Sequence, residues 1–140
     1  MSNGGRITIN LAGGGDERIK PSSLLYVRRP TYDETRGEPE VESVVVIGGV
    51  RFSVVSSSVE VADRFAAAVK VVTLTAPDST LLFVNAEAVV DVDRPATRQG
   101  KSVLVFGIGP RAPRLGVGQT REELADIWKD VGLDPDNHGI

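Results

Sequence analysis

Cysteine is absent from the 140-residue chain, and histidine occurs once, as His138. Without thiols, the sequence excludes disulfides, thiolate zinc sites, iron–sulfur clusters and cysteine nucleophiles. His138 lies close to the C-terminus, and chain ends are usually not held in a fixed position. A lone histidine with no cysteine also argues against a transition-metal site. We therefore expect neither a metal ion nor another cofactor.

Long apolar runs are missing as well. No stretch of the sequence approaches the roughly 18 apolar residues that a membrane-spanning helix needs. Residues 1–5, MSNGG, lack the charged and apolar regions of a secretory signal. We expect a protein that is not secreted by a signal peptide and has no membrane partner. It would be cytoplasmic or incorporated into a soluble assembly such as a virion.

Excess positive charge is also lacking. The chain has 16 lysines and arginines against 19 acidic residues, a net charge of −3, whereas duplex-DNA binders present a basic face to phosphates. One segment, residues 98–114, departs from this balance because it holds four basic residues and no acidic one. These candidate contacts to a partner protein or a nucleic acid are Arg98, Lys101, Arg111 and Arg114.

What the sequence does contain is an internal repeat, which predicts unit one (residues 1–69) and unit two (residues 70–140). The matched segments are 7–30 with 72–95, 43–48 with 102–107, 51–54 with 114–117, and 57–65 with 120–128. A lone unit of this length has a marginal core. We therefore expect the units to be docked, either by sharing a sheet or by packing face to face about a pseudo-two-fold axis.

Each unit ends with the signature of a helix start. Ser57 precedes Glu60, and Thr120 precedes Glu123, by the spacing of a capping box. The boxes predict helices that begin near residues 58 and 121, and Gly132 predicts the end of the second. The residues expected on the apolar faces are Val61, Phe65 and Val69 in the first helix, and Leu124, Ile127, Trp128 and Val131 in the second.

The pattern before each helix is typical of strands. Residues 7–11 alternate apolar and polar side chains. The β-branched runs at 41–47 and 102–106 are suited to central strands buried on both faces, whereas 17–20 indicates a weaker strand. Strands followed by one helix predict an α+β fold. We expect a tandem duplication of a mostly antiparallel four-stranded β-sheet unit followed by one helix.

The units differ in their loops, where binding residues tend to gather. Unit one has a long polar loop at residues 30–40, and unit two has a Gly-, Pro- and Arg-containing loop at 107–114. Residues 107–118 match neither the P-loop nor the dinucleotide fingerprint. A hairpin with a proline-stiffened tip and a contact loop for a partner or nucleic acid are both open interpretations.

No group of residues forms a catalytic pattern. Asp91 and Asp93 share one face of an expected strand, and Glu122 and Glu123 favour a helix N-terminus by charge. The serines at 56–58 lack a G-x-S-x-G turn and a usable histidine, which fits a helix cap. We predict that the protein is not an enzyme; a polar pocket with a perturbed carboxylate would reopen that question.

Three segments of unit two carry a resemblance to known families: residues 83–92, 102–107 and 120–124. They are similar to the small flagellar FlbD-type proteins and, more loosely, to the sheet of LytTR-type DNA-binding domains. The shared features are an F-x-N strand pair and an S/T-x-E-E helix start. The resemblance implies a fold type only. LytTR domains bind DNA through basic loops, for which this chain offers Arg111 and Arg114.

Two functions follow as hypotheses. The first is a non-enzymatic structural or assembly protein that binds other protein subunits through its sheet scaffold and loops, as in a virus particle or filament. The alternative is a nucleic-acid-binding regulatory protein that uses the basic segment 98–114.

Overall fold

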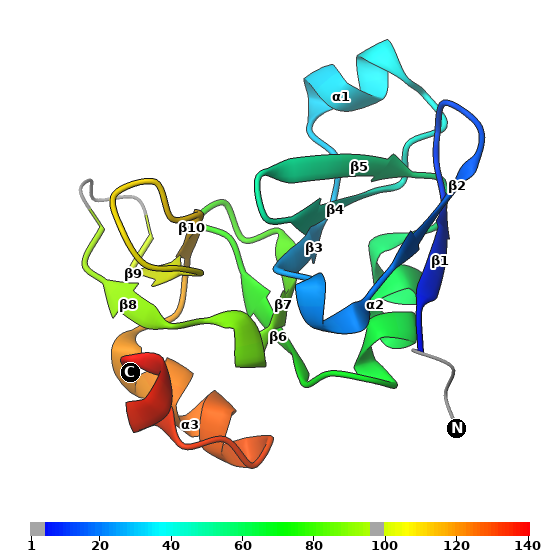
Figure 1. Cartoon of the computed structure of the whole chain (residues 1–140). Coiled ribbons are helices and arrows are strands. Elements are labelled where there is room, and N and C mark those ends of the chain that lie inside the picture. Colours follow the sequence, from blue (N-terminus) through cyan, green and yellow to red (C-terminus); the bar gives the residue numbers. More distant parts are fainter. Residues whose placement is uncertain (1–4, 96–99) are drawn as a thin grey trace.

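The computed structural model describes residues 5–95 and 100–140 (Figure 1). The elements of unit one are β1 (Ile7–Asn10), β2 (Asp16–Ile19), η1 (Pro21–Ser23), β3 (Tyr26–Arg28), α1 (Tyr32–Gly37), β4 (Ser43–Ile47), β5 (Val50–Val54) and α2 (Ser58–Ala66). Those of unit two are β6 (Val71–Thr75), β7 (Leu81–Asn85), η2 (Ala86–Ala88), β8 (Asp91–Asp93), β9 (Ser102–Val105), β10 (Arg114–Val117), α3 (Arg121–Asp130) and η3 (Pro135–His138). Helices and antiparallel sheets together confirm the α+β class.

The duplication extends to strand register. Each unit has a hairpin, a 3₁₀ turn, three strands and a helix, in that order, and unit one has the additional helix α1 between β3 and β4. In the hairpins, Ile7 pairs with Ile19 and Val72 pairs with Val84, at positions that the repeat makes equivalent. Each unit has five strands rather than the expected four. In unit one, the weak segment 17–20 overlaps β2, which pairs with β1. The boundary between residues 69 and 70 as a domain limit stays a prediction.

The two units share one sheet. Its five strands run in the order β5-β4-β3-β7-β6, so β3 of unit one pairs with β7 of unit two. The remaining strands form a two-stranded sheet, β1-β2, and a three-stranded sheet, β10-β9-β8. In Figure 1 the shared sheet lies between α2 with β1-β2 on one side and the three-stranded sheet on the other. The first of the two expected docking modes is therefore correct.

Each face of the shared sheet is covered by its own apolar cluster. The cluster under α2 joins Val45 and Phe65 with Phe83 from unit two. The cluster on the opposite face, beneath the three-stranded sheet and α3, contains Val44 and Trp128. Because Val44 and Val45 are adjacent and both buried, β4 is a central strand covered on both faces, as its β-branched run predicts.

Both long helices begin where the sequence predicts. Thr120 and Glu123 make the full capping box of α3. In α2, the Ser57 side chain accepts from the Glu60 amide at 3.2 Å, but the Glu60 carboxylate faces Arg64 at 3.6 Å instead of returning to the cap. The prediction of a reciprocal box is therefore correct for α3 and wrong for α2.

The C-terminal segment is held against unit two. His138 Nδ1 lies 2.7 Å from the carbonyl oxygen of Val89, and its ring centroid is 6.4 Å from that of Trp128. Because a carbonyl only accepts, Nδ1 carries the proton in this contact. The expectation that this chain end is not held in place is wrong. Across residues 5–95 and 100–140, no helix is long and apolar enough to cross a membrane.

Candidate interaction surfaces

The polar loop expected at residues 30–40 contains the helix α1. Thr31 caps it: its hydroxyl accepts from the Glu34 amide at 3.2 Å, and the Glu34 carboxylate accepts from the Thr31 amide at 2.7 Å. This is the same capping box that marks α3, and the sequence shows it as T-x-x-E. The interpretation of this segment as a loop is wrong, because its Thr31–Glu34 capping box begins a helix.

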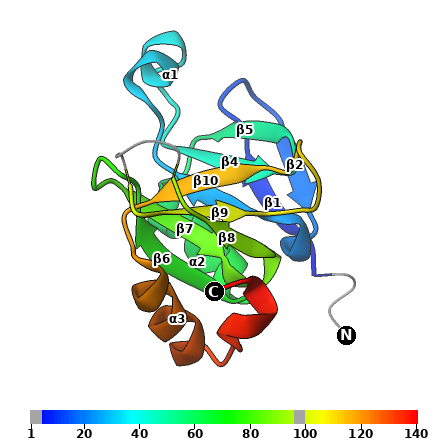
Figure 2. The ribbon, with the colours of Figure 1, turned by 90° about the vertical axis from the view of Figure 1, so that its left-hand side faces the viewer.

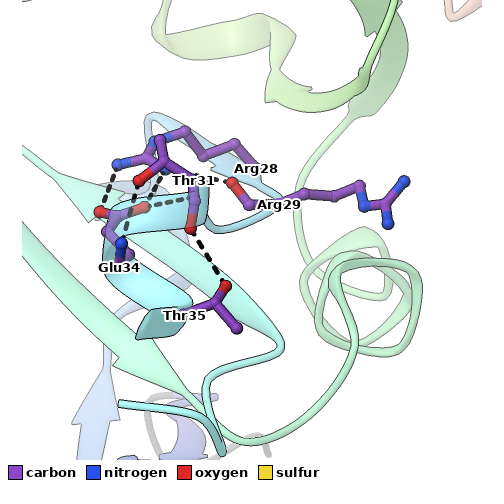
Figure 3. A network of polar contacts seen from close by, with 5 residues as sticks. All are labelled: Arg28, Arg29, Thr31, Glu34 and Thr35. Atoms are coloured by element: carbon purple, nitrogen blue, oxygen red, sulfur yellow. Dashed lines mark hydrogen bonds and ion pairs between the residues drawn. The ribbon is translucent and has the colours of Figure 1, made fainter. Parts of the chain in front are cut away.

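An ion pair fixes α1 to the shared sheet (Figure 3). Two nitrogens of Arg28, on β3, donate to the two carboxylate oxygens of Glu34 at 2.8 and 2.9 Å. This fork and the Thr31 hydrogen bonds lower the pKa of Glu34 to about 2. No residue of α1 itself is buried, so the polar network, rather than apolar packing, sets its position.

The helix presents an aromatic side chain to solvent. Tyr32, its first residue, is 78% exposed. Figure 2 shows α1 projecting away from the layered body of the protein. A helix that covers no core and carries an exposed tyrosine is a candidate contact surface, because tyrosine is enriched at protein interfaces.

Acidification is expected to release α1. The folded pKa of Glu34 lies below its ordinary value of 4.5, so its stabilising contribution is complete above that value and is lost as the pH falls towards 2. Amide hydrogen exchange at residues 32–37 should therefore accelerate over this range relative to β4. Glu34→Gln should show fast exchange already at pH 7. Equal protection of α1 in the variant and the wild type would contradict the anchoring role.

The second projecting surface is the loop between β9 and β10. It is closed at its base by a hydrogen bond from the Phe106 amide to the Pro113 carbonyl at 2.9 Å. At its tip, Gly109 has a φ of +99°, a value that other residues rarely adopt. Ile108 is 98% exposed. The segment is thus a hairpin with a stiffened tip, and that tip carries a solvent-exposed aliphatic side chain.

The role of the four predicted contact residues in binding a partner stays a prediction. Arg98 lies outside the described residues. Lys101 and Arg111 are exposed, but Arg114 is paired with Asp93 at 2.6 Å. Lys101 lines one cavity and Arg114 another.

The cavity beside Lys101 has a volume of about 770 Å³ and lies at the N-terminus of α3. Its other lining residues are Val92, Asp93, Arg94, Ser102, Thr120, Arg121 and Glu122. Sequence reasoning missed Arg94 and Arg121, which no motif marks. The two hydroxyl groups that line the cavity already make hydrogen bonds within the chain. Ser102 donates to the Gln119 carbonyl at 2.8 Å, and Thr120 caps α3.

Within the described ranges, no group of three or more His, Asp or Glu side chains is arranged to hold a metal ion. Comparisons with protein-family models, curated proteins and solved structures found no match. The resemblance to FlbD-type and LytTR-type proteins stays a prediction, and the function has to be argued from the surfaces themselves.

Proposed function

We propose that this chain is a non-enzymatic assembly protein that binds other protein subunits. The observation that carries the proposal concerns Tyr32 and Ile108, the two most exposed of the large apolar side chains described, at 78% and 98%. They lie in the two segments where the units differ, α1 and the β9–β10 loop. The elements that the two units share build the scaffold, and the segments in which the units differ supply the contacts.

Both tips are held rigid before any partner arrives. The Arg28–Glu34 fork fixes α1, and Pro110 and Pro113 stiffen the loop around Ile108. A preorganised contact loses less conformational entropy on binding, so a small apolar surface gains more affinity. Tyrosine and isoleucine on fixed supports therefore suit subunit contacts of the kind found in a virus particle or a filament.

Substitution of the tips tests this function. Tyr32→Ser and Ile108→Ser should each weaken association about tenfold, the effect of losing one interface anchor. The measurement is molar mass in solution over a range of protein concentrations. Val59→Ser is the matched control, because Val59 is 52% exposed but lies on α2. A wild-type chain that stays monomeric at every concentration would count against the proposal.

A nucleic-acid-binding function is the second candidate, because three cations line one cavity. Arg94, Lys101 and Arg121 converge there with only Asp93 and Glu122 as acidic neighbours. Phosphate binding by such a site falls steeply with salt.

The test of the second candidate is binding to a DNA duplex at several salt concentrations. If this function is right, Arg94→Ala with Lys101→Ala should weaken binding and lower the salt slope by about 2. Arg114→Ala is the control, since Arg114 is engaged by Asp93. Unchanged binding in the Arg94 and Lys101 variant would exclude this function.

A further inference from the structure

The two units use equivalent strand edges differently. In unit one, the edge of β3 away from β4 is occupied by β7, with Val27 opposite Phe83. The repeat makes β8 the equivalent of β3, and β2 the equivalent of β7. Among the described residues, β8 pairs only with β9, and β2 pairs only with β1. A two-fold axis relating the units would pair β8 with β2 just as β3 pairs with β7. Because β8 and β2 are not paired among the described residues, the units are not related by such an axis.

Side chains and the C-terminal segment cover the edge of β8 that a strand covers on β3: His138 contacts the Val89 carbonyl oxygen at 2.7 Å, and Gly139 lies against the backbone of Asp91. Val92 is the equivalent of Val27. Its amide donates to Asp91 Oδ1 at 2.8 Å, and its carbonyl oxygen accepts from Arg121 Nη2 at 2.7 Å. Tyr26 and Ser58 occupy the places of Asp91 and Arg121 in unit one, and neither can supply these bonds. The edge of β3 therefore has no such cap and pairs with β7, whereas the edge of β8 is capped.

We propose that β8 is an acceptor edge for β2 of a second copy of this chain, and that Arg121 and the C-terminal residues 138 and 139 are displaced when the strand arrives. The register is that of β3 with β7, carried over by the repeat. It places Val92 opposite Arg18, Asp91 opposite Ile19, and Asp93 opposite Glu17. The inference rests on the proposed assembly function and names one of its contacts.

The chain itself indicates the occupant. The strand that fills the β3 edge is the second strand of a hairpin, β6-β7, and the β1-β2 hairpin has the same register. Three residues of β2, Asp16, Glu17 and Arg18, are exposed. Figure 1 places β2 and β8 on opposite sides of the shared sheet, so β8 must take β2 from another copy. Because donor and acceptor are different surfaces, repetition yields a ring or a filament.

Repulsion between like charges weakens the wild-type contact, and substitutions that remove this repulsion should strengthen it. Glu17 would face Asp93, and like charges directly opposite each other on paired strands are destabilising. Asp93 is partly compensated by Arg114 at 2.6 Å. Glu17→Lys replaces repulsion by attraction in this register alone, and Arg121→Ala removes the competing donor to the Val92 carbonyl. We expect Arg121→Ala to lower the dissociation constant of the self-complex about tenfold, and Glu17→Lys to lower it about threefold.

Disulfide trapping tests the register directly, because the chain has no cysteine. Glu17→Cys and Asp93→Cys variants are mixed and oxidised. Opposed Cβ atoms lie about 4.5–5.5 Å apart in such pairs, near disulfide range. The mixed 17–93 dimer should exceed either homodimer, and Arg121→Ala in the Asp93→Cys chain should raise its yield. Arg18→Cys with Asp93→Cys is the control, since residue 18 would face the other side of the sheet.

Two outcomes overturn the proposal: a mixed dimer no more abundant than the Arg18→Cys control, or an Arg121→Ala chain that folds but associates no better than the wild type. The assembly function and the strand addition are tested by different results. If Tyr32→Ser and Ile108→Ser weaken association but no 17–93 disulfide forms, the function stands and strand addition is wrong. If the disulfide forms equally well with both tips substituted, strand addition stands and the tips are wrong.

Discussion

Phe83→Asp is expected to abolish folding. Phe83 belongs to unit two, yet it is 8% exposed in the cluster under α2, which otherwise holds buried residues of unit one. A carboxylate there has no cation to pair with among the residues of that cluster, and an unpaired buried charge costs several kcal/mol. That cost is comparable with the 5–15 kcal/mol that stabilises a typical domain. Circular dichroism at 25 °C should show an unfolded chain.

The repeat provides the control for this substitution. Arg18 is the equivalent of Phe83 and is exposed on β2. Arg18→Asp should change the free energy of unfolding by no more than about 0.5 kcal/mol, as is usual for surface positions. A stable, folded Phe83→Asp variant would mean that β7 does not pack against unit one, which would contradict the shared sheet.

Trp128→Ala is expected to lower the free energy of unfolding by about 3–5 kcal/mol, the usual cost of deleting a large buried aromatic side chain. Trp128, on α3, is fully buried, and Phe65, its repeat equivalent on α2, is fully buried as well. Phe65→Ala should cost a similar amount. Urea unfolding measures both, and Val59→Ala, at an exposed site on α2, should cost little.

The shared sheet also predicts how the Trp128→Ala and Phe65→Ala variants unfold. Because β3 pairs with β7, the loss of either core should destabilise the whole chain, and each variant should still unfold in one transition. Trp128 Nε1 has no hydrogen-bond partner within the described residues. Trp128→Phe therefore removes a buried donor that gains nothing, and it should cost less than Trp128→Ala. Two separate transitions would show that the units fold independently.

The sequence predicts the scaffold well because apolar periodicity and caps are local signals. The β-branched run of β4 and the Thr120–Glu123 box both lie where the structure has a central strand and a helix start. The pairing across units is harder to predict. Leu82 and Phe83 on β7 are apolar where β2 has Glu17 and Arg18. This contrast reflects the burial of β7 on both faces of the shared sheet, whereas β2 lies at the edge of a two-stranded sheet.

The candidate surfaces are predicted less completely. The loop at 107–114 is identified by its glycines and prolines, but the 98% exposure of Ile108 is a property of the fold. The helix α1 is short and covers no core, so only its Thr31–Glu34 box marks it. Arg121 acts through the Val92 carbonyl, a contact between residues far apart in sequence that no motif encodes. His138 is held by the carbonyl oxygen of Val89. These two residues are also far apart in sequence, so no motif predicts their contact.

The measurement that tests the central claim most directly is hydrogen exchange of the wild-type chain at low and high protein concentration, read by mass spectrometry. If the projecting tips bind other subunits, a second copy included, protection should rise with concentration at residues 31–37 and 107–113. It should stay constant in α2. Identical exchange at both tips over the whole concentration range, with the molar mass of a monomer throughout, would contradict the account.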